Sequence, residues 1–194
     1  MAILLQKQLY GGICGDRFSG KIVNCLNCGA VKSNGNNNYG VGGICGNTSS
    51  DVTIENCINR GKISYLGKRA SWYFGGAGGI IGLIRNKVII KNTINIGSVE
   101  STSVSGAICG MELYYWSNGS KYERENLYYL DNVKLCTGSI EDDTENIKLF
   151  HKEEARDIVT ELNDYIEKNE KETDYLKWNL ENDGYPGLIL QENS

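Results

Sequence analysis

The chain repeats itself, and this feature constrains its fold more than any other. A glycine-rich block occurs four times, as Gly11–Gly15, Gly42–Gly46, Gly78–Gly82 and Gly106–Gly110. A second block follows each copy, at Ile22–Val31, Ile54–Ile63 and Ile90–Val99, with a divergent fourth copy at Arg124–Val133. The glycine blocks begin 31, 36 and 28 residues apart. Two blocks in a fixed order, copied at similar spacing, indicate a repeat architecture.

The second block predicts short strands. Val52–Ile58 alternates apolar and polar residues, and asparagine and glycine follow it. Short β-branched runs interrupted by these two residue types predict strands separated by turns that accept positive φ. A period of about 30 residues with two or three strands per copy predicts one coil of a parallel β-solenoid per repeat. The predicted fold class is therefore an all-β parallel β-solenoid with a small C-terminal α-helical cap.

Stacked coils would bring equivalent side chains into columns. Four columns are predicted: Ile13, Ile44, Ile80 and Ile108; Cys14, Cys45, Ile81 and Cys109; Ile22, Ile54 and Ile90; and Cys25, Cys57, Thr93 and Leu127. The first two columns are adjacent in sequence, and neighbouring residues of a straight strand face opposite sides. Both point inward only at a bend, which the flanking glycines can supply.

The two blocks resemble the GLUG-motif family, which pairs a Gly-Gly-Leu/Ile-Val/Cys-Gly element with an Ile-x-Asn-Cys-x-Asn-x-Gly-x-Val element. The resemblance covers about residues 10–133, and residues 178–188 resemble the Trp…Gly-Tyr-Pro-x-Leu ending that follows such arrays. Repeats of this family occur in secreted bacterial surface proteins, including adhesin-like proteins and regions of immunoglobulin A metallopeptidases. The resemblance implies an extracellular or cell-surface location within a longer chain, and it identifies a scaffold rather than a chemistry.

The chain is predicted to divide into two parts. Residues 1–134 form the β-solenoid of about four repeats, and residues 135–194 form a helical cap or extension ending in the Trp178…Asp183-Gly184-Tyr185-Pro186-Gly187-Leu188 segment. Apolar residues recur at helical spacing between Ala155 and Ile166, which predicts a helix over residues 152–168. Because the last coil lacks a neighbour, this helix is expected to cover the open hydrophobic end of the solenoid.

Composition excludes several classes of partner. A net charge of −4 and the lack of a basic stripe argue against nucleic-acid binding. The longest nearly apolar stretch, Phe74–Ile84, has eleven residues, five of them glycine, so no membrane insertion is expected. Met1–Leu5 is too short and lacks the basic start of a signal peptide. The hydrophobic content of 40% suffices for a core.

Motifs for chemistry are incomplete. Cys25–Cys28 has the C-x-x-C spacing, but the repeat places Cys25 in a column and Cys28 at a variable position, and no second pair exists. Gly15–Ile22 nearly spells a phosphate-binding loop, yet it lacks the final Ser or Thr and precedes a strand. His151 is the single histidine and is expected to be a surface or capping residue. The acidic run Glu141–Asp143 matches no EF-hand loop. No catalytic residue, metal site or cofactor is predicted.

The chain has seven cysteines, and because this number is odd they cannot all pair in disulfides within the chain. In-register stacking places equivalent residues about 4.8 Å apart, so parallel Cβ atoms lie beyond the usual disulfide separation. Cys14, Cys45 and Cys57 are therefore predicted to be buried, unbridged thiols. The redox states of Cys28 and Cys136 stay open.

Two aromatic clusters depart from the repeat and are the candidate binding residues. They are Trp72, Tyr73 and Phe74, and Tyr114, Tyr115 and Trp116. Exposed aromatic side chains suit binding to a host glycan or protein. The alternative is that both clusters fold back onto the coils as hydrophobic lids.

The sequence favours a non-catalytic repeat module of a bacterial secreted or cell-surface protein. It would serve adhesion or ligand binding, or act as a spacer whose ends contact neighbouring repeats. A carbohydrate-active enzyme on a β-helix is one alternative, but the acids Asp16, Asp51, Glu55 and Glu100 occupy unmatched repeat positions. An accessory region of a surface metallopeptidase is the other, although no H-E-x-x-H motif is present in this chain.

Overall fold

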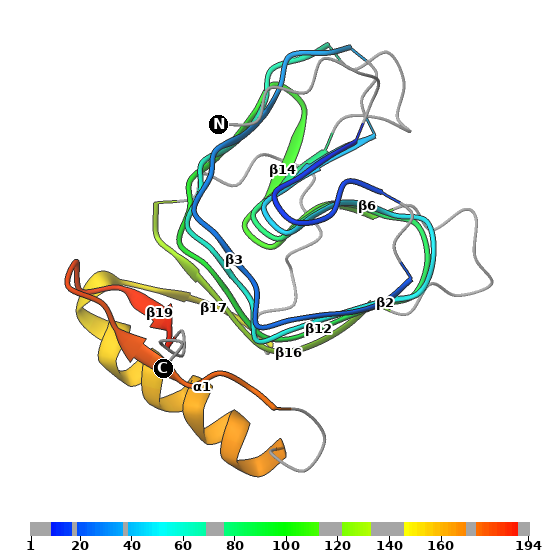
Figure 1. Ribbon diagram of the computed structural model, residues 1–194. Helices are drawn as coiled ribbons and strands as arrows, with labels where there is room; N and C mark the ends of the chain where they lie inside the picture. The colour runs from blue at the N-terminus through cyan, green and yellow to red at the C-terminus, as the bar shows by residue number, and fades with distance from the viewer. Residues whose placement is uncertain are drawn as a thin grey trace, which may run out of the picture.

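The computed structural model describes residues 9–16, 19–36, 39–68, 76–112, 122–132, 146–169 and 174–189. The fold is mostly β, with parallel strands in several sheets and one α-helix near the C-terminus. Successive turns of the chain overlie one another when viewed along their common axis (Figure 1). We call these turns coils 1 to 4.

Each coil corresponds to one copy of the sequence repeat. Coil 1 contains β1 (Leu9–Gly11), β2 (Gly20–Val23), β3 (Leu26–Asn27) and β4 (Val31–Ser33). Coil 2 contains β5 (Gly40–Gly42), β6 (Cys45–Thr48), β7 (Val52–Glu55), β8 (Ile58–Asn59) and β9 (Ile63–Tyr65). Coil 3 contains β10 (Gly76–Gly78), β11 (Ile81–Ile84), β12 (Val88–Asn95) and β13 (Val99–Ser101). Coil 4 contains β14 (Val104–Gly106), β15 (Cys109–Glu112) and β16 (Tyr122–Leu130).

Equivalent strands of neighbouring coils pair in parallel and form four sheets. The first sheet has the order β1-β5-β10-β14, the second β6-β11-β15 and the fourth β4-β9-β13. The third has the order β2-β7-β12-β16-β17, in which β17 is Ile147–Phe150, with β3 pairing with β8 and β8 with β12. The register follows the sequence repeat, because Leu9 and Gly76 both align with Gly40.

The glycine block forms a bend between the first and second sheets. Ile44, Ile80 and Ile108 are buried in one column, and the Ile44 amide donates to the Ile80 carbonyl at 3.0 Å. The adjacent residue Cys45 belongs to the same core cluster, so both columns do point inward. Ile13 departs from the prediction, since its side chain is 47% exposed. Its coil has a described neighbour on one side only.

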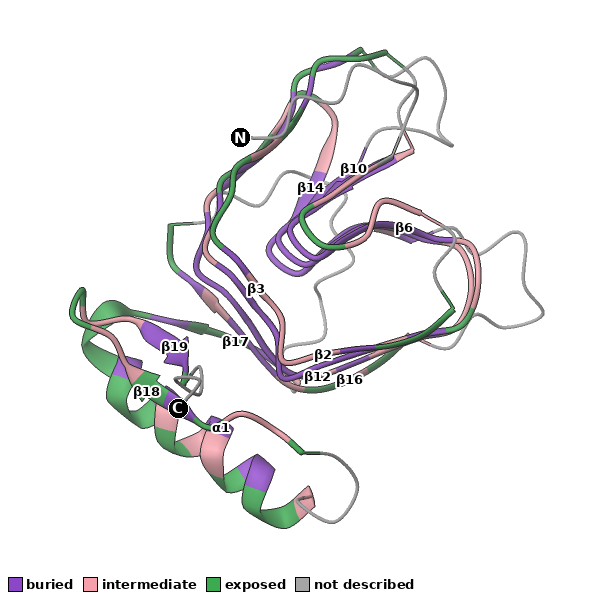
Figure 2. Ribbon diagram, viewed as in Figure 1, coloured by how far each residue is buried: buried purple, intermediate pink, exposed green. Residues whose placement is uncertain are grey.

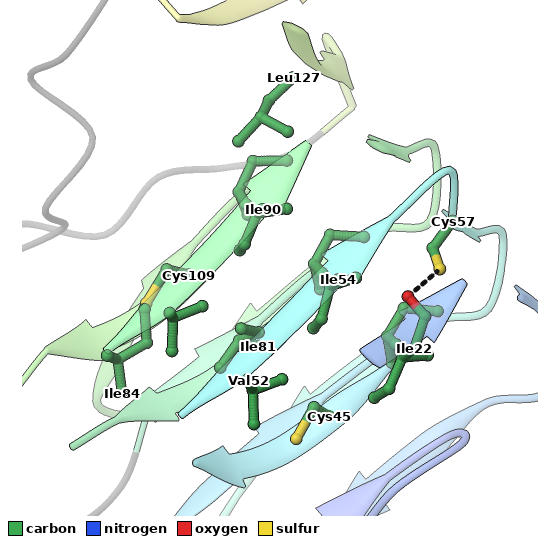
Figure 3. Packing of buried hydrophobic residues seen from close by; sticks show 14 of the residues in the cluster. Ile22, Cys45, Val52, Ile54, Cys57, Ile81, Ile84, Ile90, Cys109 and Leu127 are labelled. Carbon is green, nitrogen blue, oxygen red and sulfur yellow. Dashed lines mark hydrogen bonds between the residues drawn. The ribbon is translucent and has the colours of Figure 1, made fainter. Parts of the chain in front are cut away.

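The predicted columns of the third sheet are also present. Ile22 and Ile90 both align with Ile54 in the strand register. Figure 3 shows these three side chains one behind another, with Cys45, Ile81 and Cys109 in a second row. Side chains from the second and third sheets thus form one core, and a smaller core lies between the first and fourth sheets. Buried residues overlie one another in the stacked strands of the coils, for example at β6 and β10 in Figure 2.

The glycines act through close approach rather than through positive φ. A methyl group at Gly42 would lie 2.0 Å from the Cys45 carbonyl oxygen, and one at Gly43 would lie 2.4 Å from the Asn59 side chain. Among the described glycines only Gly20 and Gly184 have positive φ. The left-handed conformation belongs instead to four equivalent asparagines, Asn24, Asn56, Asn92 and Asn126, with φ between 44° and 56°. The predicted positive-φ turns are therefore present in the repeat blocks, and asparagine rather than glycine supplies them.

The C-terminal part begins with β17 (Ile147–Phe150), which pairs with the end of β16. A 3₁₀ turn, η1 (Lys152–Glu154), leads into α1 (Ala155–Asn169), as the periodicity predicted. An antiparallel pair, β18 (Trp178–Leu180) and β19 (Pro186–Leu188), completes it. The division of the chain at residue 134 stays a prediction.

The predicted position of the helix is wrong. The buried face of α1 packs on Ile58, Ile94 and Tyr128, which belong to coils 2, 3 and 4, so the helix lies along the side of the coils and not over their end (Figure 1). These three residues each follow an inward-facing column residue, and alternation along the strand turns them outward. The outward apolar row requires a cover, and α1 with β18 and β19 provides it.

Candidate functional site

The aromatic binding residues predicted from the sequence lie outside the described part of the chain. These are Trp72, Tyr73, Phe74, Tyr114, Tyr115 and Trp116. Their role in binding stays a prediction. The third tryptophan, Trp178, is buried against α1 and the coils.

Four asparagines form a ladder along one corner of the coils, which we call the corner ladder. The Asn56 amide donates to the Asn24 carbonyl oxygen at 2.7 Å, Asn92 to Asn56 at 2.8 Å, and Asn126 to Asn92 at 2.7 Å. Asparagine tolerates the left-handed backbone better than other residues that have a Cβ. Every copy of the second block has asparagine at this position, so the sequence contained the signal for the ladder.

The C-terminal segment 174–178 lies across the start of the corner ladder. Asn24 accepts the Leu176 amide at 3.0 Å and donates its side-chain amide to the Asp174 carbonyl at 2.9 Å. Asn56 donates to the Leu176 carbonyl at 2.8 Å and accepts the Trp178 indole N–H at 2.6 Å. The ladder therefore binds an extended peptide of its own chain through both backbone and side-chain groups.

A second, inner ladder joins the two sequence blocks. Asn27 donates to Asn59 at 2.8 Å, and Asn59 donates to Asn95 at 2.8 Å. Each of these amides also reaches a glycine carbonyl two residues further along, at 3.0 Å. In coil 4, tyrosine replaces this asparagine at Tyr129, and alanine replaces the facing glycine at Ala107. The inner ladder is a packing device, and we assign it no ligand.

A polar cleft of about 340 Å³ opens between α1 and the strands β16 and β17. It is lined by Glu125, Asn126, Asn146, Lys148, Glu161, Asp164, Tyr165, Lys168 and Asn169. Carboxylates, amides and ammonium groups converge there, which suits a small polar ligand that is held by several hydrogen bonds. The sequence analysis missed this cleft, because its residues come from the divergent fourth repeat and from the unrepeated tail.

Glu161 is at the centre of the electrostatics of the cleft. It accepts hydrogen bonds from Lys148 at 2.8 Å and from the Tyr128 hydroxyl at 2.6 Å. These bonds, that from Lys148 foremost, lower the pKa of Glu161. Burial, followed by the bond to Glu161, raises the pKa of Tyr128 far above its ordinary value. Glu161 is thus an ionised hydrogen-bond acceptor at neutral pH and not a proton donor.

Charged residues on the coil surfaces pair between neighbouring coils. Lys62 reaches Glu100 at 2.7 Å. Lys91 aligns with both Glu55 and Glu125 and reaches Glu125 at 3.1 Å. Burial alone would lower the pKa of Lys91, but its hydrogen bond to Glu125 and the charges of the surrounding glutamates together outweigh this, and the pKa is raised. Lysine therefore separates these two acids along the column.

The cysteines in the columns form no disulfide bonds. Cys45 and Cys57 are buried, as predicted, whereas Cys14 is only half-buried. Hydrogen bonds from Cys45 and Cys57 lower the pKa values of Cys14 and Cys25, respectively, to about 7. The bond to Cys14 raises the pKa of Cys45, and burial raises that of Cys57.

The two cysteines of the C-x-x-C spacing differ in their burial. Cys25 packs against the core beside its column, whereas Cys28 is exposed. Among the described residues no group of three or more His, Cys, Asp or Glu side chains could hold a metal ion. Cys136 lies outside the described ranges.

His151 precedes the helical segment as a capping residue. Its backbone N–H donates to the Glu154 carboxylate at 2.7 Å, and its ring Nδ1 lies 2.9 Å from Asp131. The hydrogen bond to Asp131 raises the pKa of His151. This agrees with the predicted surface or capping role.

Comparisons with known proteins give one informative match. No family model matches the chain, and no curated protein matches its sequence. The chain is similar to a crystal structure from Bacteroides ovatus named as a "putative immunoglobulin A1 protease", with 25% sequence identity and a TM-score of 0.61. The match covers 94% of this chain and 53% of that one, so the chain spans about half the length of its structural relative.

The single described α-helix, α1, is neither long nor apolar enough to cross a membrane. The structural match is consistent with the link to immunoglobulin A peptidases that the GLUG resemblance implied. The resemblance to the GLUG family rests on the sequence motifs, and no family model confirms it.

Proposed function

We propose that the chain is a non-catalytic, parallel β-solenoid module of a bacterial secreted or cell-surface protein. It carries ligand-binding surfaces on a rigid stack of repeats. The observation that carries this proposal is the in-register pairing of equivalent strands in coils 1 to 4, which places the repeat blocks in stacked columns. A stack of this kind holds loops at fixed separations, which is what a spacer or an adhesive module needs.

The distribution of charge supports a binding role over a catalytic one. Glycosidases of the usual kind need two acids that flank one bond and differ in protonation. Here Lys91 stands between Glu55 and Glu125, and Glu161 is held ionised by Lys148 and the Tyr128 hydroxyl. These acids are placed to accept hydrogen bonds.

The bacterial and extracellular assignment is supported by the structural relative and by the sequence motifs. The relative comes from Bacteroides ovatus, and its name describes a protease that acts on an immunoglobulin. The free column thiols are compatible with a poorly oxidising external setting.

The proposed ligand surfaces are the two aromatic segments and the polar cleft beside α1. Binding to a glycan array and to a panel of host proteins tests this function. The variants Trp72→Ala and Trp116→Ala remove one aromatic segment each, and Glu161→Gln alters the cleft. Glu153→Gln, on the exposed face of η1, is the matched control for charge.

We expect binding that at least one of the three site variants abolishes, while Glu153→Gln retains it and circular dichroism stays unchanged. If the chain binds neither the glycan array nor any protein of the panel, only the spacer role remains. Hydrolysis of a polysaccharide panel, lost on changing a single Asp or Glu, would contradict the non-catalytic function.

An accessory region of a surface peptidase is the second candidate, favoured by the structural relative. Incubation of the chain with immunoglobulin A1 tests it. Co-elution of the two proteins without new immunoglobulin fragments supports the accessory role. Fragments that form with the purified chain alone would contradict it, and so would the lack of any complex.

A further inference from the structure

Two pairs of cysteines face each other between coils 1 and 2. Cys14 and Cys45 pair in an isolated parallel β-bridge. Cys25 and Cys57 directly precede β3 and β8, whose residues pair in register. In each pair the buried thiol of coil 2 donates a hydrogen bond to the half-buried sulfur of coil 1. The two sulfur atoms of each pair therefore point toward one another.

The spacing within each pair suits a bridging metal ion better than a disulfide. Equivalent residues of neighbouring parallel strands lie about 4.8 Å apart, whereas the Cβ atoms of a disulfide lie about 3.5–4.5 Å apart. A bond between a thiolate and a metal ion is about 2.3 Å long in zinc sites, so two such bonds in line span about 4.6 Å. The strand spacing therefore accommodates a sulfur–metal–sulfur bridge without movement of the backbone.

The number of ligands determines which ion fits. In coil 3 the equivalent positions hold Ile81 and Thr93, so the next coil adds no thiol to either pair. Within the described ranges no cluster of three or more His, Cys, Asp or Glu side chains is able to hold a metal ion. A structural zinc site needs four ligands. Two thiolates in line instead suit Cu(I), a soft monovalent ion that prefers sulfur and accepts linear coordination.

The surroundings of both pairs are apolar. Cys45 and Cys57 belong to the main core cluster, and Cys14 and Cys25 pack against it. Figure 3 shows the sulfur atoms of Cys45 and Cys57 within this cluster of aliphatic side chains. An apolar shell limits the access of water to a bound ion, which disfavours hard cations that keep their hydration. The half-buried thiols of coil 1 are the first ligands that an incoming ion meets.

We propose that Cys14–Cys45 and Cys25–Cys57 are two-coordinate binding sites for Cu(I), with one ion in each pair. Binding forms two sulfur–copper bonds, and both sulfur atoms give up their protons to the solvent. Copper stays monovalent, so the step needs no oxidant, and each bridged pair carries one net negative charge. A bound ion joins coil 1 to coil 2 and stabilises the folded chain. This property is independent of the binding of glycans or host proteins.

Copper retention by the reduced full chain tests the sites. Cu(I) is added without oxygen in the presence of a competing chelator of Cu(I), the protein is desalted, and atomic absorption measures the copper that stays bound. The wild type should retain one ion per cysteine pair. Cys25→Ser should lose the ion of its own pair, and the double variant Cys14→Ser/Cys25→Ser should lose both. Copper should raise the melting temperature of the wild type and not that of the double variant.

Cys28→Ser is the matched control, because Cys28 shares the C-x-x-C spacing with Cys25 but is exposed and belongs to neither pair. This variant should retain both ions. Circular dichroism of each variant without copper checks that the fold is kept, and half-buried Cys25 is a milder site for serine than buried Cys57. X-ray absorption at the copper edge of the loaded wild type should show two sulfur neighbours for each ion.

Loss of all copper from the wild type to the chelator would overturn the proposal, and so would full retention by the double variant. Equal losses from Cys28→Ser and Cys25→Ser would assign the ion to the C-x-x-C segment instead. Three or four sulfur neighbours around copper would contradict the two-coordinate geometry. Copper retention is measured without any glycan or host protein, so its failure is distinguishable from failure of the proposed function.

Discussion

Asn92 offers the sharpest test of why asparagine recurs at the corner of every coil. Its side chain is fully buried, its φ is 44°, and it takes part in two ladder hydrogen bonds, with Asn56 at 2.8 Å and Asn126 at 2.7 Å. Two separable effects are therefore combined in one residue. The backbone needs a left-handed conformation, and the ladder needs a donor and an acceptor.

Two substitutions separate these effects. Asn92→Gly tolerates the backbone but removes both bonds and leaves buried amide groups of its neighbours unpaired, which costs about 2–4 kcal/mol. Asn92→Ala adds a Cβ in the left-handed region, at a further cost of about 1 kcal/mol. The wild type is expected to have the highest free energy of unfolding, Asn92→Gly a lower one and Asn92→Ala the lowest. This order reverses the usual preference for alanine over glycine.

Equilibrium urea unfolding, followed by far-ultraviolet circular dichroism and by tryptophan fluorescence, measures the two differences. Both probes must show the same transition for a two-state treatment to hold. An alanine variant at least as stable as the glycine variant would refute the backbone argument. A loss below about 0.5 kcal/mol in both variants would refute the ladder argument.

Three further predictions follow from the core, the thiols and the histidine. Ile44→Ala should lower the unfolding free energy by about 2–5 kcal/mol, because the side chain is fully buried in its column, and an unchanged melting temperature would contradict this. Alkylation of Cys14 and Cys25 without denaturant should reach half its maximal rate near pH 7, and an ordinary profile centred near pH 8.5 would argue against the thiol pairs. The pKa of His151, measured by NMR, should exceed about 6.5 and should return towards this value in the Asp131→Asn variant. The stabilisation that the His151–Asp131 pair gives to the folded state is present below about pH 6.5 and is lost as the pH rises through the raised pKa of the folded protein. An identical titration of His151 in the wild type and in Asp131→Asn would show that the ion pair does not raise the pKa.

The repeated positions were predictable because the chain supplies its own comparison. Ile44, Ile80 and Ile108 occur in matching copies of one block, so their register follows from the sequence and is confirmed by the strand pairing. The same logic separated Cys25 from Cys28. It also predicted the bend, because two adjacent inward columns admit no straight strand.

The roles of glycine and asparagine were harder to assign. Both residue types accept unusual backbone conformations, so sequence alone does not say which of them uses that freedom. The choice depends on what surrounds each position. Gly43 is required because the Asn59 side chain lies against its Cα, and this contact joins two blocks that are separate in sequence.

The spatial placement of features that occur once in the chain was missed. The sequence shows the apolar face of the helix but does not show the surface on which that face packs, so the helix was expected at the end of the stack. The outward residues Ile58, Ile94 and Tyr128 look like ordinary strand residues until the alternation is traced from their inward neighbours. The polar cleft depends on where α1 docks, so its residues could not be brought together from sequence.

Coil 4 departs from the repeat at several positions, and the sequence alone could have shown that these substitutions occur together. Tyr129 replaces the inner-ladder asparagine where Ala107 replaces the facing glycine, so two changes remote in sequence compensate in space. Arg124 replaces an inward isoleucine and stacks over the Tyr122 ring at 3.9 Å. Substitutions that exchange an apolar column for polar groups mark the coil at which the stack ends.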